Sequence, residues 1–398
     1  MRRSCGRAAF TVCLGCLGLL ATGCGGGAIR DSERRAPSTS PSADYYVSPK
    51  GNDRHDGSRR RPWRTIGRAA AQVGPGSTVH VAAGRYAGPV VIRADGEPGR
   101  PIRFTSEVRW GARITASASG PMAVVWIAGD HVELTGFDVS GRGGDGTVGI
   151  LAAGSHDRVI GNDVHDVVVA CNGGPNGGGG IVAGGGTPNY RNDDIDVVGN
   201  LVHDVVGTPT RRCPGVQGIY ASVPRVRIVN NVSYRNGDDC ITSWHAASRL
   251  TIVNNTALYC PTGIVVGSGG PGATSAGNVG TTVANNIVAR CGDGIAQTTD
   301  GEHRVGPGNR YLNNLIFDSG NVGWLSGLAS SDGATVSRTI AADPKLMGEQ
   351  AHYRPTAASP AIDAGLATAA PRSDFDGVSR PRGRRVDIGA FEWRRSRP

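Results

Sequence analysis

A short phrase recurs six times between residues 159 and 314, and it constrains the fold more than any other feature of the chain. Each copy has two mostly apolar residues followed by Gly-Asn or Asn-Asn: Val159-Ile160-Gly161-Asn162, Val197-Val198-Gly199-Asn200, Ile228-Val229-Asn230-Asn231, Ile252-Val253-Asn254-Asn255, Val283-Ala284-Asn285-Asn286 and Tyr311-Leu312-Asn313-Asn314. Such self-similarity is typical of solenoids, whose units bury their apolar faces by stacking on each other.

A second phrase, a small residue followed by Ile, alternates with the first. Its copies are Gly149-Ile150, Gly180-Ile181, Gly218-Ile219, Cys240-Ile241, Gly263-Ile264 and Gly294-Ile295. The shortest spacings, Ile219 to Ile241 and Ile241 to Ile264, are 22 and 23 residues. Because the other spacings are longer, we interpret the extra residues as loops inserted into a coil of constant size.

Short strands divided by Asn and Gly turns are expected within each coil, since Val and Ile favour strands and Asn and Gly favour turns. The 62 glycines lack the every-third spacing of collagen, and the composition does not suit a helical bundle. The leucine consensus of leucine-rich repeats is also absent. The periodic asparagines are expected to form an internal hydrogen-bonded ladder.

The first 24 residues are typical of an export signal, with early arginines, an apolar run over residues 8–20 and small residues before Cys24. The end of this segment resembles a bacterial lipobox, which implies lipidation of Cys24. Residues 25–43 are expected to be a flexible linker. We therefore expect an exported lipoprotein on the outer face of a membrane, since no later segment has the length of a transmembrane helix.

Export permits disulfides among the five later cysteines. Cys171 and Cys213 lie in two matching loops and are expected to pair. Cys260 and Cys291 each follow a ladder asparagine by five residues and are expected to pair across neighbouring coils, which leaves Cys240 as a buried thiol.

Two histidines, His165 and His203, begin the two matching loops in the sequence Val-His-Asp. We expect them to form hydrogen bonds at the loop bases and not to bind metal.

The net charge of +9 comes almost entirely from arginine, because Lys50 and Lys345 are the only lysines. One interpretation is attraction to an acidic polymer through bidentate contacts to carboxylates. The other is a coding bias combined with arginine clusters near the two ends. The sequence has no stripe of alternating aromatic and basic residues, which would indicate nucleic-acid binding.

The chain from Asp44 onward resembles the right-handed parallel β-helix proteins of the pectate-lyase-like superfamily. The opening Tyr45-Tyr46-Val47-Ser48-Pro49-Lys50-Gly51-Asn52-Asp53 and the segment Pro62-Trp63-Arg64-Thr65-Ile66 are similar to the start of many such secreted proteins. The resemblance implies an all-β solenoid with a capping helix near 65–73. Residues 44–105 would form the N-terminal cap and first coils, and residues 106–340 the β-helix.

The segment Ser359-Pro360-Ala361-Ile362-Asp363-Ala364-Gly365, with Asp387-Ile388-Gly389-Ala390-Phe391-Glu392, resembles the closing segment named choice-of-anchor Q. This resemblance implies a C-terminal cap over residues 341–398, because an open solenoid edge needs protection from pairing with other chains. The acidic residues in this segment are expected to be structural.

Equivalent positions of stacked coils form rows. The residues two before each Ile are Gly179, Gln217, Asp239, Thr262 and Asp293, and those just after it are Val182, Tyr220, Thr242, Val265 and Ala296. The first row is expected to line a ridge at the turn entering the strand, and the second to face outward. Tyr220 and Trp244 would then flank Asp239 as a sugar-binding platform; an ordinary solenoid surface is the alternative.

The string Gly237-Asp238-Asp239-Cys240-Ile241 resembles the central motif of polygalacturonases, the inverting pectin hydrolases of this superfamily. The resemblance implies an Asp one coil earlier and a His one coil later, where this chain has Gln217 and Thr262. Asp239 and Asp293, roughly 9.6 Å apart across two strands, could supply the two carboxyls that inversion requires.

The alternative chemistry is β-elimination from an acidic polysaccharide, in which a base removes the proton beside a uronate carboxylate and a cation neutralises that carboxylate. Asp238 and Asp239 resemble the paired acidic residues with which pectate lyases of this fold hold calcium, and Asn192-Asp193-Asp194 could complete the shell. His245 and Arg249 are the candidate bases, with Arg235 as a further arginine.

The favoured function is a surface-anchored, calcium-assisted lyase of an acidic uronate polysaccharide, with Asp239, His245 and Arg249 as catalytic residues. Gln217, Tyr220, Trp244 and Asp293 would bind the substrate. An inverting hydrolase and a non-catalytic carbohydrate-binding or adhesion solenoid remain the alternatives. We expect a monomer.

Overall fold

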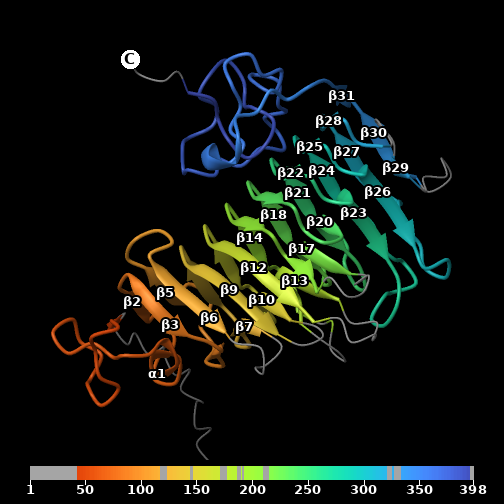
Figure 1. The fold of residues 1–398 in the computed structure, drawn as a ribbon. Coiled ribbons are helices and arrows are strands. Elements are labelled where there is room, and N and C mark those ends of the chain that lie inside the picture. Colours follow the sequence, from red (N-terminus) through yellow and green to blue (C-terminus); the bar gives the residue numbers. More distant parts are fainter. Residues whose placement is uncertain are drawn as a thin grey trace, which may run out of the picture. The chain divides into compact units, whose positions relative to one another are not determined.

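Three parallel sheets, connected in a repeating order along the chain, form the described part of the molecule (Figure 1). The computed structural model describes residues 43–116, 123–143, 147–170, 177–185, 190, 192–208, 215–320, 325–326 and 333–394. Within them the chain visits each sheet once per turn, and each strand pairs in parallel with its equivalents in the neighbouring turns. The predicted parallel β-helix is thereby confirmed; its handedness stays a prediction.

Sheet I carries the second phrase, small residue then Ile. Its strands are β4 (Val90–Ile92), β7 (Ala123–Ile127), β10 (Val148–Ala152), β13 (Gly178–Ala183), β17 (Val216–Ala221), β20 (Asp239–Ser243), β23 (Thr262–Ser268), β26 (Asp293–Thr299) and β29 (Leu325–Ser326).

Sheet II ends at the asparagine turns. Its strands are β1 (Asp44–Val47), β2 (Thr78–Val81), β5 (Ile102–Ser106), β8 (Val132–Thr135), β11 (Arg158–Ile160), β14 (Asp196–Val198), β18 (Arg227–Val229), β21 (Thr251–Val253), β24 (Thr282–Ala284), β27 (Arg310–Leu312) and β30 (Thr335–Ser337).

Sheet III follows those turns. Its strands are β3 (Gly84–Ala87), β6 (Ala112–Ala116), β9 (Asp138–Gly143), β12 (Asp163–Val169), β15 (Leu201–His203), β19 (Val232–Tyr234), β22 (Thr256–Leu258), β25 (Ile287–Ala289), β28 (Leu315–Phe317) and β31 (Ile340–Ala341), with β16 (Val206–Gly207) paired to β12.

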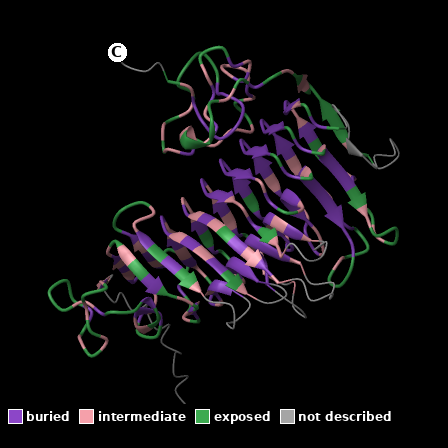
Figure 2. Ribbon diagram, viewed as in Figure 1, coloured by how far each residue is buried: buried purple, intermediate pink, exposed green. Residues whose placement is uncertain are grey.

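The isoleucines of the second phrase pair in register on successive strands of sheet I and point into the coil. All six are buried, with at most 3% of their surface exposed. Figure 2 shows that buried residues continue along the strands from turn to turn. The apolar interior is therefore a column of stacked side chains, and each turn is stabilised by its two neighbours.

The second asparagine of each repeated pair forms the predicted internal ladder. Asn231 is typical: its Nδ2 donates to Asn255 Oδ1 at 3.0 Å and to the Val197 carbonyl at 2.9 Å. Its own Oδ1 accepts from the backbone N–H of Asn200 at 2.9 Å. Because Asn231 has no exposed surface, these bonds satisfy polar groups that would otherwise be buried alone.

Two short helices complete the described structure. Helix α1 (Ile66–Ala70) begins after Thr65, whose hydroxyl accepts from the Arg68 N–H, and it buries Ile66, Ala69 and Ala70. The 3₁₀ helix η2 (Glu349–Ala351) lies in the C-terminal segment. Neither helix, nor any other helix in the described ranges, has the length and hydrophobicity needed to cross a bilayer.

Residues 342–394, called the strap below, lie along the side of the coil, whereas the sequence predicted a cap at its end. The first asparagine of each later pair, with φ near 55°, donates its side-chain amide to a strap carbonyl. Asn230 donates to Ser373, Asn254 to Asp387 and Gly389, Asn285 to Leu366, and Asn313 to Ala364. The strap therefore contacts four successive turns.

The outward face of sheet III explains this position. One of its rows changes from Arg113, Asp138 and Asp163 in the early turns to Leu201 and Val232 in the later ones. The later residues are buried against strap side chains, among them Phe375, Ala390 and Phe391. Covering this apolar stretch stabilises the strap on the side of the solenoid.

The disulfide prediction for Cys260 was wrong. Cys260 bonds to Cys240, with Cα atoms 5.6 Å apart, and Cys291 is a buried free thiol. Cys240 occupies the position of the small residue before Ile, which points into the coil. Its sulfur therefore faces Cys260 in the next loop. The equivalent partner for Cys291 is Gly263, which has no side chain; a Cβ there would lie 3.5 Å from the Cys291 sulfur.

Candidate active site

Asp239 begins β20 at the amino-terminal edge of sheet I, and 8% of its surface is exposed. Thr242 donates its hydroxyl to Asp239 Oδ2 at 2.5 Å, from the same strand. A second hydroxyl comes from Thr262, which is the register partner of Asp239 on β23. The carboxyl group is thus held in a fixed direction by two strands.

Burial, and secondly the neighbouring charge of Asp238, raise the pKa of Asp239 to about 7. The two threonine hydroxyls lower it and only partly offset that effect. A carboxyl with this pKa can both accept and release a proton near neutral pH, which is the property required of a general base or acid.

The strand register aligns the residues of both predicted rows on sheet I. Gly179 pairs with Gln217, and Asp239 pairs with Thr262, which pairs with Asp293. The second row runs through Val182, Tyr220, Thr242, Val265 and Ala296. Asp239 and Asp293 are therefore two strands apart, roughly 9.6 Å at the usual strand spacing.

His245 and Arg249 lie at the opposite edge of sheet I from Asp239. The strand β20 runs five residues from Asp239 to Ser243, roughly 13 Å, and both residues follow it in the turn toward sheet II. Arg249 is exposed, and its backbone N–H bonds to Val279. The structure therefore does not bring these two predicted bases to the carboxyl of Asp239, because the intervening strand is straight.

An aromatic cluster forms around His245 instead. The ring of Tyr190 stacks on His245 with centroids 4.7 Å apart, and the edge of Tyr220 approaches it at 6.2 Å. Burial lowers the pKa of His245. Trp244 packs over Gly267, where an added Cβ would lie 2.2 Å from the indole. Sequence reasoning missed Tyr190, which lies in a loop outside the repeat.

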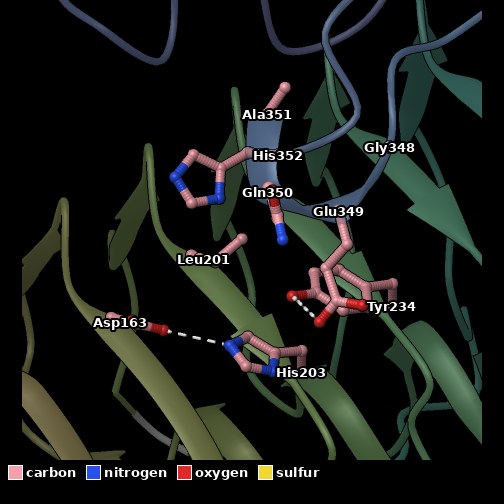
Figure 3. Close-up of a pocket in the computed structure, with 9 residues that line it drawn as sticks. All are labelled: Asp163, Leu201, His203, Tyr234, Gly348, Glu349, Gln350, Ala351 and His352. Carbon is pink, nitrogen blue, oxygen red and sulfur yellow. Dashed lines mark hydrogen bonds and ion pairs between the residues drawn. The ribbon is translucent and has the colours of Figure 1, made fainter.

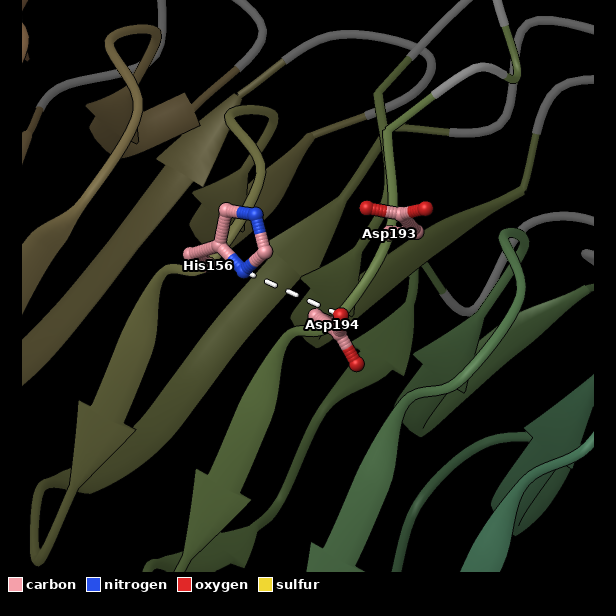
Figure 4. Close-up of side chains that lie close together, drawn as sticks. All are labelled: His156, Asp193 and Asp194. Carbon is pink, nitrogen blue, oxygen red and sulfur yellow. Dashed lines mark ion pairs between the residues drawn. The ribbon is translucent and has the colours of Figure 1, made fainter. Parts of the chain in front are cut away.

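The loop containing Asp193 and Asp194 contacts His156, also at the carboxyl-terminal side of sheet I (Figure 4). The two carboxylates and the imidazole are close enough to share a cation. However, Arg225 forms ion pairs with both carboxylates, so much of their charge is already balanced. This loop does not complete a site at Asp238 and Asp239, from which it is separated by the width of the sheet.

The contacts of Asp238 and Asp239 decide whether these two residues can hold a calcium ion. Asp238 Oδ2 accepts from the Gly215 N–H at 2.8 Å, and Asp239 is held by the two threonines. Two carboxylates are the right kind of ligand but fall short of the six to eight oxygens that calcium takes. The described residues alone therefore do not form a calcium site, and we derive no catalytic step through the ion.

A cavity of about 900 Å³ lies elsewhere, between sheet III and the strap (Figure 3). His203 lines it, within 3.4 Å of Asp163 and hydrogen-bonded to Asp204 at 2.7 Å. His165 stacks on His203 and contacts Asp138 and Asp166, and these carboxylates raise its pKa to about 9. As predicted, both histidines make hydrogen bonds at the loop bases.

Cys24, Cys171 and Cys213 lie outside the described residues, so lipidation and the pairing of the two loop cysteines stay predictions.

Comparisons with known proteins give a fold but no family for the whole chain. A family model described as "Protein of unknown function (DUF1565)" matches residues 49–91. The uncharacterized protein YwoF of Bacillus subtilis is 29% identical over 134 residues, which cover 31% of this chain and 29% of YwoF. The match therefore spans less than a third of that protein.

Solved structures resemble the chain over most of its length. Pectate lyase Pel9A has a TM-score of 0.54 and 16% identity, covering 89% of this chain and 97% of its own. A rhamnogalacturonan lyase has a TM-score of 0.45 and 14% identity, covering 85% and 99%. At this identity the similarity to Pel9A establishes the shared parallel β-helix fold alone.

Proposed function

We propose that the chain is an exported polysaccharide lyase, anchored through Cys24, that cleaves an acidic uronate polymer by β-elimination with Asp239 as the proton acceptor. The observation that carries the proposal is Asp239 itself, a carboxyl with a pKa of about 7 on the outward face of sheet I. The fold shared with pectate lyase Pel9A supports the same class of substrate.

The reaction needs one proton acceptor at a fixed place. The Asp239 carboxylate takes the proton from the carbon beside the uronate carboxyl group, and the electron pair forms a carbon–carbon double bond. The bond from the next carbon to the glycosidic oxygen breaks, and that oxygen takes a proton from water. Thr242 and Thr262 position the acceptor, and the aromatic Tyr220 lies in the neighbouring strand to contact sugar rings.

Calcium assistance is a competing form of the proposal, in which Asp238 and Asp239 would contribute ligands, the substrate carboxylate and water would complete the shell, and Asp239 would not be the free base. The cation would neutralise the uronate carboxylate. If Asp239 serves as a ligand, it cannot also be the free base, so calcium dependence and proton acceptance by Asp239 make opposite demands on this residue.

The test is ultraviolet absorbance of the mature protein with pectate, alginate and glycosaminoglycans, before and after addition of a chelator. We expect absorbance to rise with one of these polymers, because elimination leaves a conjugated double bond. A chelator should abolish the rise if calcium assists and leave it unchanged if Asp239 acts alone. A lyase acting on these polymers is excluded if absorbance stays flat with and without added calcium.

Hydrolysis is the second candidate because Asp239 and Asp293 lie two strands apart in register. Their roughly 9.6 Å spacing is at the upper end of the separation between the acid and base of inverting glycosidases. Reducing ends would then accumulate without ultraviolet absorbance. A binding-only solenoid would show neither product, and its polymer binding would depend on Tyr220 and Trp244.

A further inference from the structure

The outward row on sheet I that passes Asp239 continues well beyond the predicted site. Toward the N-terminal turns, Tyr220 pairs in register with Val182, which pairs with Leu151, and Leu151 pairs with Trp126 on β7. Four strand steps separate Trp126 from Thr242, the neighbour of Asp239, or roughly 19 Å. Tyr220 and Val182 are partly exposed and Leu151 is buried, so the row that leads along the sheet from Asp239 is open to solvent at Tyr220, Val182 and Trp126.

A cationic group lies at the far end of this row. The guanidinium of Arg93, just after β4, lies over the ring of Trp126 at 5.6 Å from its centroid. Arg93 is exposed and Trp126 is partly exposed. The indole holds the guanidinium by a cation–π contact, which reduces the side-chain freedom that a ligand would otherwise have to restrict.

Arg93 differs from Arg158 and Arg227 of sheet II in having no acidic partner among the described residues. On sheet II, Arg158 contacts Glu133 and Asp196, and Arg227 contacts Asp196, so positive and negative side chains alternate along one row. Those arginines are neutralised within the protein. The exposed Arg93 has no such partner in the described ranges, and its guanidinium can bind an external anion.

We propose that Arg93 and Trp126 form a distal subsite that binds the carboxylate of one uronate residue in the polymer whose cleavage point lies at Asp239. The guanidinium supplies a bidentate partner for a carboxylate, and the partly exposed Trp126, Val182 and Tyr220 supply contact for sugar rings. This subsite rests on the proposed function. Because it is roughly 19 Å from Asp239, only a chain of several sugars reaches both places.

The test compares Arg93→Gln with Arg85→Gln, an exposed arginine on β3 of sheet III without an acidic partner in the described ranges. Arg93→Gln is expected to raise the KM for polygalacturonate or alginate about tenfold, the order of one charged hydrogen bond, with kcat unchanged. The same variant should leave the KM for the matching trisaccharide unchanged. Arg85→Gln should alter neither value, and Arg93→Lys should recover part of the affinity.

A binding assay that needs no turnover distinguishes failure of the subsite from failure of the proposed lyase function. Affinity electrophoresis in gels containing polygalacturonate or alginate should show retardation of the wild type that Arg93→Gln weakens and Arg85→Gln does not. If that pattern holds without any product, the subsite stands and the lyase proposal fails. If product forms but Arg93→Gln and Arg85→Gln behave alike, the subsite is overturned and the lyase proposal stands; absence of both binding and product overturns both.

Discussion

Replacing Asp239 with Asn is expected to lower kcat by about 10²- to 10⁴-fold, the usual contribution of a general base. The amide has nearly the shape of the carboxylate and still accepts a hydrogen bond from Thr242, so the fold of β20 should not change. It cannot take a proton from the substrate. The rate of ultraviolet product formation measures the loss, and circular dichroism checks the fold.

Asp293→Asn is the matched control, because Asp293 lies in the same outward row two strands away. The lyase proposal predicts that this variant keeps most of its activity, whereas hydrolysis by the two carboxyls predicts a loss as large as that of Asp239→Asn. An Asp239→Asn variant with wild-type kcat would remove this residue from the reaction under either mechanism.

Replacing Glu392 with Gln is expected to destabilise the docked strap by about 3–5 kcal/mol, the usual cost of leaving one member of a buried ion pair alone. Glu392 Oε1 accepts from Arg380 at 2.6 Å, and neither side chain is exposed. Arg380 also donates to Asn230 of the coil, so the pair connects the strap to the solenoid. Chemical unfolding and limited proteolysis within residues 342–394 would report the loss.

The control for this prediction is Glu97→Gln, which removes an exposed ion pair with Arg100 and should cost at most about 1 kcal/mol. The double variant Arg380→Met with Glu392→Leu should recover most of the stability, since apolar side chains of similar size can replace a buried pair. Equal stability of Glu392→Gln and Glu97→Gln would show that the buried pair does not hold the strap.

The fold and the rows of the site could be predicted from sequence because a solenoid converts spacing into position. The alignment of Ile219, Ile241 and Ile264 puts residues at the same offset into register, which places Asp239 beside Thr262 and two strands from Asp293. The asparagine ladder followed in the same way. These features depend only on local spacing and on contacts between adjacent turns.

Features that depend on distances along a strand or on long-range packing could not be predicted. His245 is six residues after Asp239, and the straight strand between them puts them at opposite edges of the sheet. Cys240 pairs with Cys260 because both side chains face inward at one turn. The prediction compared only the cysteines that follow a ladder asparagine by five residues, and Cys240 is not one of them. The lateral position of the strap depends on the apolar outward face of sheet III, which several successive turns form together.

The first position of the repeated Gly-Asn or Asn-Asn pair did indicate where the strap contacts the coil. Gly161 and Gly199 occupy this left-handed position in the two early copies, and asparagine occupies it in the four later copies. Backbone conformation alone allows either residue. The change to asparagine coincides with the turns at which its side-chain amide binds a strap carbonyl.

The pH dependence of kcat, followed by ultraviolet absorbance and by reducing ends on the polymer that gives product, tests the role of Asp239 as the proton acceptor. Because the Asp239 carboxyl has a pKa of about 7 and must be deprotonated to accept a proton, we expect elimination to accelerate as pH rises and to level off above about 7. A rate of bond cleavage that instead falls as pH rises through 7, without ultraviolet absorbance, would make Asp239 the acid of a hydrolase and contradict the account.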